Sequence, residues 1–139
     1  MSNPGASSRP SGADSLPAEI LRAVKAAQDK KGADIVVMDL RDVGAFTDYF
    51  VICSGQNPRQ VTAIAENIEQ ALKESHVRPS HVEGYKRAEW VLLDYFDFIV
   101  HIFNRETRLF YALDRLWGSA PRIAPAEHDG RPASSLSAP

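Results

Sequence analysis

The most informative stretch of the chain is residues 82–117, which read VEGYKRAEWVLLDYFDFIVHIFNRETRLFYALDRLW. Its part from residue 90 to 103 is apolar except at Asp94, Asp97 and His101. Strands usually run about 5–6 residues, so this part is too long for one strand, and two aspartates near its middle favour a turn. The sequence therefore predicts a hairpin with strands over residues 90–94 and 98–103.

A final helix is predicted directly after this hairpin. Asn104 is a residue type that caps helix N-termini, and apolar side chains recur after it at helical spacing. Gly118 is typical of a helix C-terminus. The side chains expected to face the core are Leu109, Ala112, Leu113 and Leu116, with Trp117 on the same side.

One helix and two strands are predicted at the start of the folded part. Pro17 suits the first position of a helix, and Lys30, Lys31 and Gly32 suit a cationic last turn followed by a C-terminal glycine. The run 34–40 is short and rich in β-branched residues, the run 49–54 is apolar, and both are typical of strands. The second run is apolar at both alternating positions, which indicates a strand buried on both sides.

The helix that follows has the clearest periodicity in the chain. Asn57 can cap it and Pro58 fills its first turn. Its inward side chains are expected to be Val61, Ile64, Ala65, Ile68, Ala71 and Leu72. The order of elements is then α-β-β-α-β-β-β-α, which indicates an α/β fold with a mixed β-sheet flanked by helices.

Composition indicates an ordinary globular protein with one domain. The chain has 139 residues, of which 44% are hydrophobic and 24% charged, enough for one core but not for two. Its net charge of −2 lacks the basic balance of a protein whose main task is to bind nucleic acid. We therefore expect no dedicated nucleic-acid contact.

The ends of the chain and its single cysteine add further expectations. Residues 1–16 and 119–139 are rich in Ser, Pro, Gly and Ala, so they are predicted to be disordered tails of a domain over 17–118. Cys53 alone cannot form an internal disulfide. There is no run of about 18 apolar residues and no signal-peptide pattern. These features predict a cytoplasmic protein with no membrane contact.

Several short blocks occur in a fixed order between residues 17 and 118. They are DYFVICSG (48–55), RQV (59–61) with Ile64-Ala65, VEGY (82–85), EWVLLDY (89–95), VHIF (100–103) and YALDRLW (111–117). Together they resemble the ribosomal silencing factor family, RsfS, also called Iojap. Blocks in a fixed order are far more specific than any one of them.

The resemblance implies a fold and a function. Proteins similar to this chain have a nucleotidyltransferase-like fold but are not known as transferases. They bind the large ribosomal subunit through its protein number fourteen and sterically block the joining of the small and large subunits, which lowers translation when nutrients are scarce. Family members also occur as homodimers when free. The resemblance implies no enzyme activity and no cofactor.

Trp90 stands where a polar loop becomes a strand, so it could anchor either the core or a partner. The resemblance favours the partner. Leu92 shares a strand face with Trp90 because side chains alternate, and nearby carboxylates suit a basic ribosomal protein. The predicted binding residues are Glu83, Tyr85, Glu89, Trp90, Leu92 and Asp94.

The competing hypothesis is a metal-dependent nucleotidyltransferase-like enzyme. It would place Ser54-Gly55 near a nucleotide and use Asp94 and Asp97 as metal ligands. Two carboxylates on one strand face need a spacing of two, whereas these are three apart across a predicted turn. No Gly-rich phosphate loop is present, and four scattered histidines lack metal-ligand spacing. We therefore predict no catalytic residue and no metal site.

One residue departs from the family pattern. Phe96 stands in the hairpin turn where the family usually has glycine. Glycine adopts a positive φ without steric cost, whereas phenylalanine is strained there. The turn is therefore expected either to adopt another type or to belong to a slightly longer hairpin.

Overall fold

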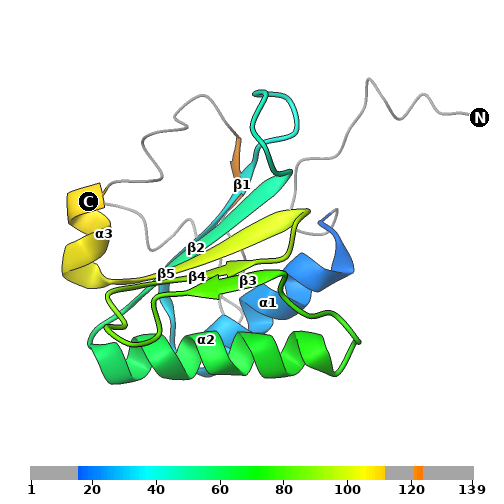
Figure 1. The fold of residues 1–139 in the computed structure, drawn as a ribbon. Helices are drawn as coiled ribbons and strands as arrows, with labels where there is room; N and C mark the ends of the chain where they lie inside the picture. The colour runs from blue at the N-terminus through cyan, green and yellow to red at the C-terminus, as the bar shows by residue number, and fades with distance from the viewer. Residues whose placement is uncertain (1–15, 112–120, 124–139) are drawn as a thin grey trace, which may run out of the picture.

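The computed structural model describes residues 16–111 and 121–123. Within these ranges the helices flank a single six-stranded sheet (Figure 1). The elements in chain order are α1 (Ala18–Asp29), β1 (Ala33–Asp39), β2 (Tyr49–Gly55), α2 (Pro58–Lys73), β3 (His81–Glu83), β4 (Trp90–Asp94), β5 (Phe98–Asn104), α3 (Arg105–Tyr111) and β6 (Arg122–Ile123). None of these helices has the length and apolar character needed to cross a membrane.

The predicted α/β class and mixed sheet are confirmed. The strands lie in the order β3-β4-β5-β2-β1-β6, with β2 and β5 parallel and the other neighbouring pairs antiparallel. The predicted hairpin is β4–β5, and its second strand is one residue longer than expected. The narrower likeness to nucleotidyltransferases stays a prediction.

The N-terminus of α2 forms as predicted. The side-chain oxygen of Asn57 accepts a hydrogen bond from the backbone N–H of Gln60 at 2.9 Å, and Pro58 occupies the first turn. The cap satisfies one of the N–H groups that a helix start leaves without a partner. The fully buried side chains of this helix are Val61, Ile64, Ala65, Ile68 and Leu72.

The end of α1 differs from the prediction. The helix stops at Asp29, so the two lysines follow the last turn instead of forming it. Lys31 adopts the left-handed conformation, with a φ of 62°, and the N–H of Gly32 bonds to the carbonyl of Ala27 at 2.8 Å. This is the Schellman arrangement, in which a lysine holds the position that glycine more commonly takes.

β6 lies within the segment that composition assigns to the C-terminal tail. Ile123 pairs with Val37 of β1, Arg122 pairs with Met38, and the Ile123 side chain is buried. Leu16, which composition assigns to the N-terminal tail, is buried in the main core, so the folded part includes one residue more than predicted. Pro121 accepts the N–H of Asp39 at its carbonyl. The rest of both predicted tails lies outside the described residues. So do four predicted core residues, Ala112, Leu113, Leu116 and Trp117.

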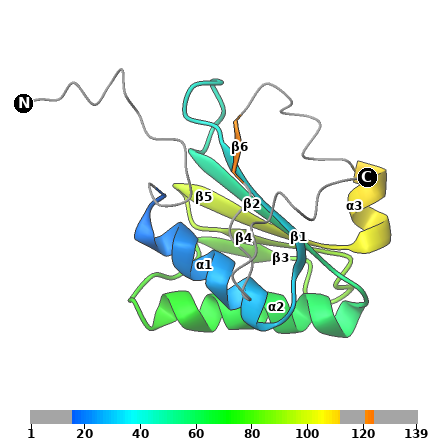
Figure 2. The ribbon, with the colours of Figure 1, turned by 180° about the vertical axis from the view of Figure 1, so that it is seen from behind.

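The two faces of the sheet differ, because α1 and α2 pack on only one of them. Helices α1 and α2 both pack on one face, as Figures 1 and 2 show from opposite sides. That face holds the main core, to which Val51, Val91 and Ile102 contribute fully buried side chains. The other face, here called the aromatic face, carries Val36, Met38, Phe50, Ile52, Trp90, Leu92, Ile99, His101 and Phe103.

Candidate partner-binding face

Trp90 begins β4 on the aromatic face and is half-buried. Its ring centroid lies 5.0 Å from that of Phe103, the residue directly opposite on β5, and 5.9 Å from that of His101. Its indole N–H donates a hydrogen bond to Nδ1 of His101 at 3.1 Å. The polar atom of Trp90 is therefore used inside the molecule, and the exposed part of the ring offers apolar surface.

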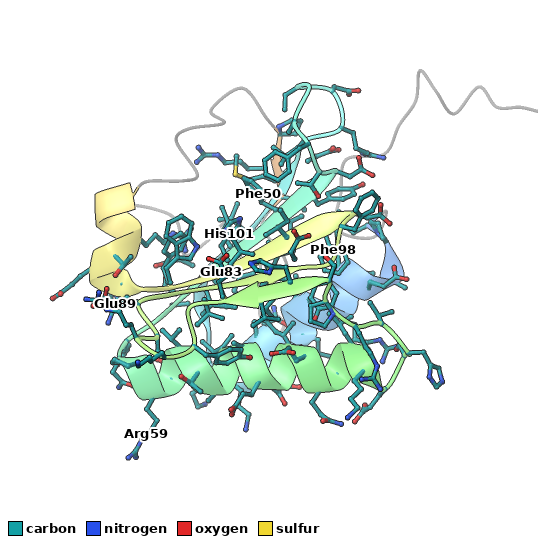
Figure 3. All side chains as sticks on the ribbon, in the orientation of Figure 1. Phe50, Arg59, Glu83, Glu89, Phe98 and His101 are labelled. Atoms are coloured by element: carbon teal, nitrogen blue, oxygen red, sulfur yellow. The ribbon has the colours of Figure 1, made fainter. Side chains whose placement is uncertain are left out.

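His101 supports Trp90 from beneath. Its side chain is buried, and the ring of Phe50 meets it edge-on with centroids 4.6 Å apart. Figure 3 shows Phe50 and His101 on the side of the sheet away from α2. Burial lowers the pKa of His101 to about 3, so the ring is neutral at pH 7. A neutral ring can accept from the indole at Nδ1 and carries its proton at Nε2.

We predict that His101 makes the fold sensitive to acid. Its pKa is lowered in the folded protein, so between about pH 6.5 and 3 the unfolded chain binds a proton that the folded chain excludes. Stability is then lost as the pH falls below about 6.5. One such proton lowers the free energy of unfolding by about 2 kcal/mol between pH 6.5 and 5.

His101→Asn is the matched variant for this test. The asparagine oxygen can stand where Nδ1 stands and still accept from Trp90, but asparagine does not titrate. Urea unfolding at pH 7 and pH 5 should therefore show a smaller acid-induced loss in the variant. An equal loss in both proteins would show that His101 does not carry the effect.

Four of the predicted binding residues come together on or beside the aromatic face. Leu92 follows Trp90 on the same face and is half-buried. Glu83 lies directly opposite Leu92 on the edge strand β3, so its exposed side chain shares this face. Asp94 belongs to the same row, but its Oδ1 accepts the backbone N–H of Phe96 at 2.8 Å. Asp94 therefore serves the turn as well as the face.

The other two predicted residues lie elsewhere. The Tyr85 side chain packs against the helix-covered core, and its hydroxyl donates to Glu69 of α2 at 2.5 Å. Tyr85 is thus on the opposite side of the sheet from Trp90. Glu89 is exposed, lies 3.5 Å from the guanidinium of Arg87, and sits at the α3 end of the sheet (Figure 3). An exposed pair of this kind contributes little to stability.

A tight turn fixes the start of β4. Gly84 has a φ of 95°, and its carbonyl accepts the N–H of Ala88 at 2.8 Å. A Cβ on Gly84 would lie 2.0 Å from the carbonyl oxygen of Trp90. Only glycine fits both this conformation and this contact, so Gly84 determines where the Trp90 backbone lies.

The hairpin turn keeps the conformation that suits glycine. Phe96 has a φ of 74°, and its side chain is exposed. The expectation that the turn would adopt another type or lengthen is therefore wrong. The strained residue is held on both sides, because its N–H donates to Asp94 and its carbonyl accepts from the hydroxyl of Thr47 at 2.9 Å.

The positions of Gly55 and Asp94 in the sheet argue against the nucleotidyltransferase hypothesis. Asp94 pairs with Ile99 at the start of β5, whereas Gly55 pairs with Asn104 at its end. Five strand residues separate these positions by about 17 Å. The serine-glycine pair and Asp94 therefore lie at opposite ends of the sheet, which argues against a compact site for a nucleotide and its metal.

Ser54 and Gly55 have structural roles instead. The Ser54 hydroxyl accepts a hydrogen bond from Arg108 at 3.0 Å. A Cβ on Gly55 would lie 2.9 Å from a methyl group of Val61, so glycine allows α2 to approach the strand. Cys53 is fully buried, and burial raises the pKa of its thiol to about 12. It packs as a small apolar residue.

Comparisons with known proteins agree with the observed fold. The family model described as ribosomal silencing factor during starvation, RsfS, matches residues 13–138. The ribosomal silencing factor RsfS of Halalkalibacterium halodurans is 38% identical over 101 residues, which cover 73% of this chain and 86% of that protein. The factor of the same name from Bacillus subtilis is 39% identical over 99 residues, covering 71% and 84%.

A solved structure is similar as well. The crystal structure of a Chromobacterium violaceum protein superposes with a TM-score of 0.70 and 33% identity, covering 72% of this chain and 83% of that one. The family model, the relatives and the shared fold converge on one conclusion. The chain belongs to the ribosomal silencing factor family.

Proposed function

We propose that this protein binds the large ribosomal subunit through its protein number fourteen and sterically prevents the small subunit from joining. Translation would then be repressed under nutrient limitation. Membership of the ribosomal silencing factor family supports a role in translation control. The binding site is inferred from two half-buried apolar side chains, Trp90 and Leu92, on the sheet face opposite α1 and α2, where most other side chains are buried.

The accessible part of the aromatic face around Trp90 suits a binding surface. Tryptophan is enriched among residues that carry most of the energy of protein–protein contacts. Trp90 is held in place by Phe103 and His101, so little side-chain freedom is lost when a partner covers it. The carboxylate of Glu83 at the edge of this face would favour a basic ribosomal protein and speed its encounter.

Tyr85 and Glu89 are less well placed for the same contact. Tyr85 is bonded to Glu69 on the helix-covered side of the sheet. We therefore assign the partner contact to Trp90, Leu92 and Glu83, with Asp94 at the edge. Because ribosomes are its partner, the protein is proposed to act in the cytoplasm, without catalysis and without a cofactor.

Sedimentation with separately purified subunits tests this function. The protein should pellet with the large subunit and stay in solution with the small subunit. Equal pelleting with both subunits, or with neither, would contradict the proposal.

We further propose that free chains form a homodimer. If the dimer uses the aromatic face, a chain cannot hold a second copy and the ribosome together. Mass measurement in solution should show the dimer disappearing as large subunits are added. A dimer that persists on the large subunit would show that the two contacts use different surfaces.

A further inference from the structure

Two loops at one end of the sheet each present an exposed phenylalanine. The side chain of Phe46, in the β1–β2 connection, is 76% exposed, and that of Phe96, in the β4–β5 turn, is 79% exposed. Among the described residues the only other exposed large apolar side chain is Leu21, at 39%. Figure 1 shows the β1–β2 connection at the end of the sheet away from α3.

The two loops are bonded to each other beside these rings. The hydroxyl of Thr47 donates to the carbonyl of Phe96 at 2.9 Å, and the N–H of Asp48 donates to the carbonyl of Asp97 at 3.1 Å. Thr47 is itself buried. Residues 46–48 and 95–97 therefore form one fixed structure, here called the aromatic rim.

Among the residues that the structure describes, no packing contact accounts for phenylalanine at position 96. Its backbone has a φ of 74°, a conformation that strains a bulky residue and that glycine adopts readily. The side chain is almost as exposed as it would be in an unfolded chain, so its packing contributes little stability to offset the strain. A ring held outward at a steric cost is suited to contact with another molecule.

The charge of the aromatic rim indicates which kind of partner it can bind. The rim carries the exposed carboxylates of Asp48 and Asp97, while the guanidinium of Arg41 is paired with Asp39 at 2.6 Å. Nucleic acid and anionic lipid are negatively charged, so these carboxylates would repel them. A second copy docked by two-fold symmetry would bring one acidic rim against the other. A basic protein surface with an apolar pocket is complementary to both the rings and the charge.

We propose that the aromatic rim is a second contact with the basic ribosomal protein that the aromatic face binds. This inference rests on the proposed function. Trp90 begins β4 and Asp94, which bonds to Phe96, ends it, so about 13 Å of strand separates the two surfaces. A single protein partner can cover such a distance.

Phe96→Gly separates binding from stability, because the two should change in opposite directions. Glycine removes the strain, and the melting temperature is expected to rise by about 4 °C. It also removes the ring, and affinity for purified large subunits should fall about tenfold, further still when Phe46→Ser is added. Leu21→Ala, on exposed apolar surface of α1, is the matched control and should bind like the wild type.

The outcomes distinguish this inference from the proposed function. If the wild type does not bind large subunits, both fail. If Trp90→Ala weakens binding while the double rim variant binds like the wild type, the aromatic rim is not part of the contact but the proposed function stands. A photoreactive benzoyl-phenylalanine at position 96 should crosslink to ribosomal protein number fourteen in the purified complex, and a crosslink only to another ribosomal protein would contradict the inference. Crosslinks only to ribosomal RNA or to a second copy of this chain would overturn the inference.

Discussion

Replacing Gly84 with alanine is expected to lower the free energy of unfolding by about 4 kcal/mol. Two costs combine. The φ of 95° strains a residue that has a Cβ, and that Cβ would lie 2.0 Å from the carbonyl oxygen of Trp90. The neighbouring atom is backbone, so it can move only if the start of β4 moves with it.

Urea or thermal unfolding measures this loss, which corresponds to a fall in melting temperature of about 20 °C. Gly44→Ala is the matched control. Gly44 also has a positive φ, 77°, but a Cβ there meets nothing within 4 Å. It should lose only about 1 kcal/mol. Equal losses in the two variants would show that contact with Trp90 is not the dominant cost.

Trp90→Ala is expected to weaken binding to the large ribosomal subunit by about 2 kcal/mol or more, about thirtyfold in affinity. The change removes the largest half-buried apolar surface of the aromatic face. It also leaves Nδ1 of His101 without its donor. Because Trp90 is only half-buried, the variant should remain folded, which circular dichroism can check.

Two variants sharpen this test. Trp90→Phe keeps an aromatic ring on Phe103 but loses the bond to His101, so an intermediate affinity is expected. Arg59→Ala changes an exposed residue of α2, on the other side of the sheet (Figure 3), and should leave binding unchanged. Undiminished binding by a folded Trp90→Ala protein would remove the aromatic face from the proposed contact.

The sequence was most informative where local chemistry determines structure. The cap Asn57 and the following Pro58 start α2 as predicted, and two aspartates place the hairpin turn. Strand alternation then put Leu92 on the face of Trp90, as observed. The same register places residue 92 opposite residue 101, so the nearness of His101 to Trp90 could also have been predicted.

Features set by distant contacts were not predictable in this way. β6 has two residues with no periodicity, and it exists by pairing with β1. Tyr85 follows a glycine turn whose conformation no alternation rule describes, so its direction toward Glu69 could not be foreseen. Phe96 keeps a strained φ because bonds from Thr47 and to Asp94 hold it. Such tertiary constraints override local preference.

A subunit-joining assay tests directly whether this protein keeps the two ribosomal subunits apart. Purified small and large subunits are mixed under conditions that favour complete ribosomes, with increasing amounts of this protein, and the particles are separated on a sucrose gradient. Complete ribosomes should decrease and free subunits increase with the wild-type protein, and far less with Trp90→Ala. Unchanged formation of complete ribosomes at saturating wild-type protein would contradict the proposed function.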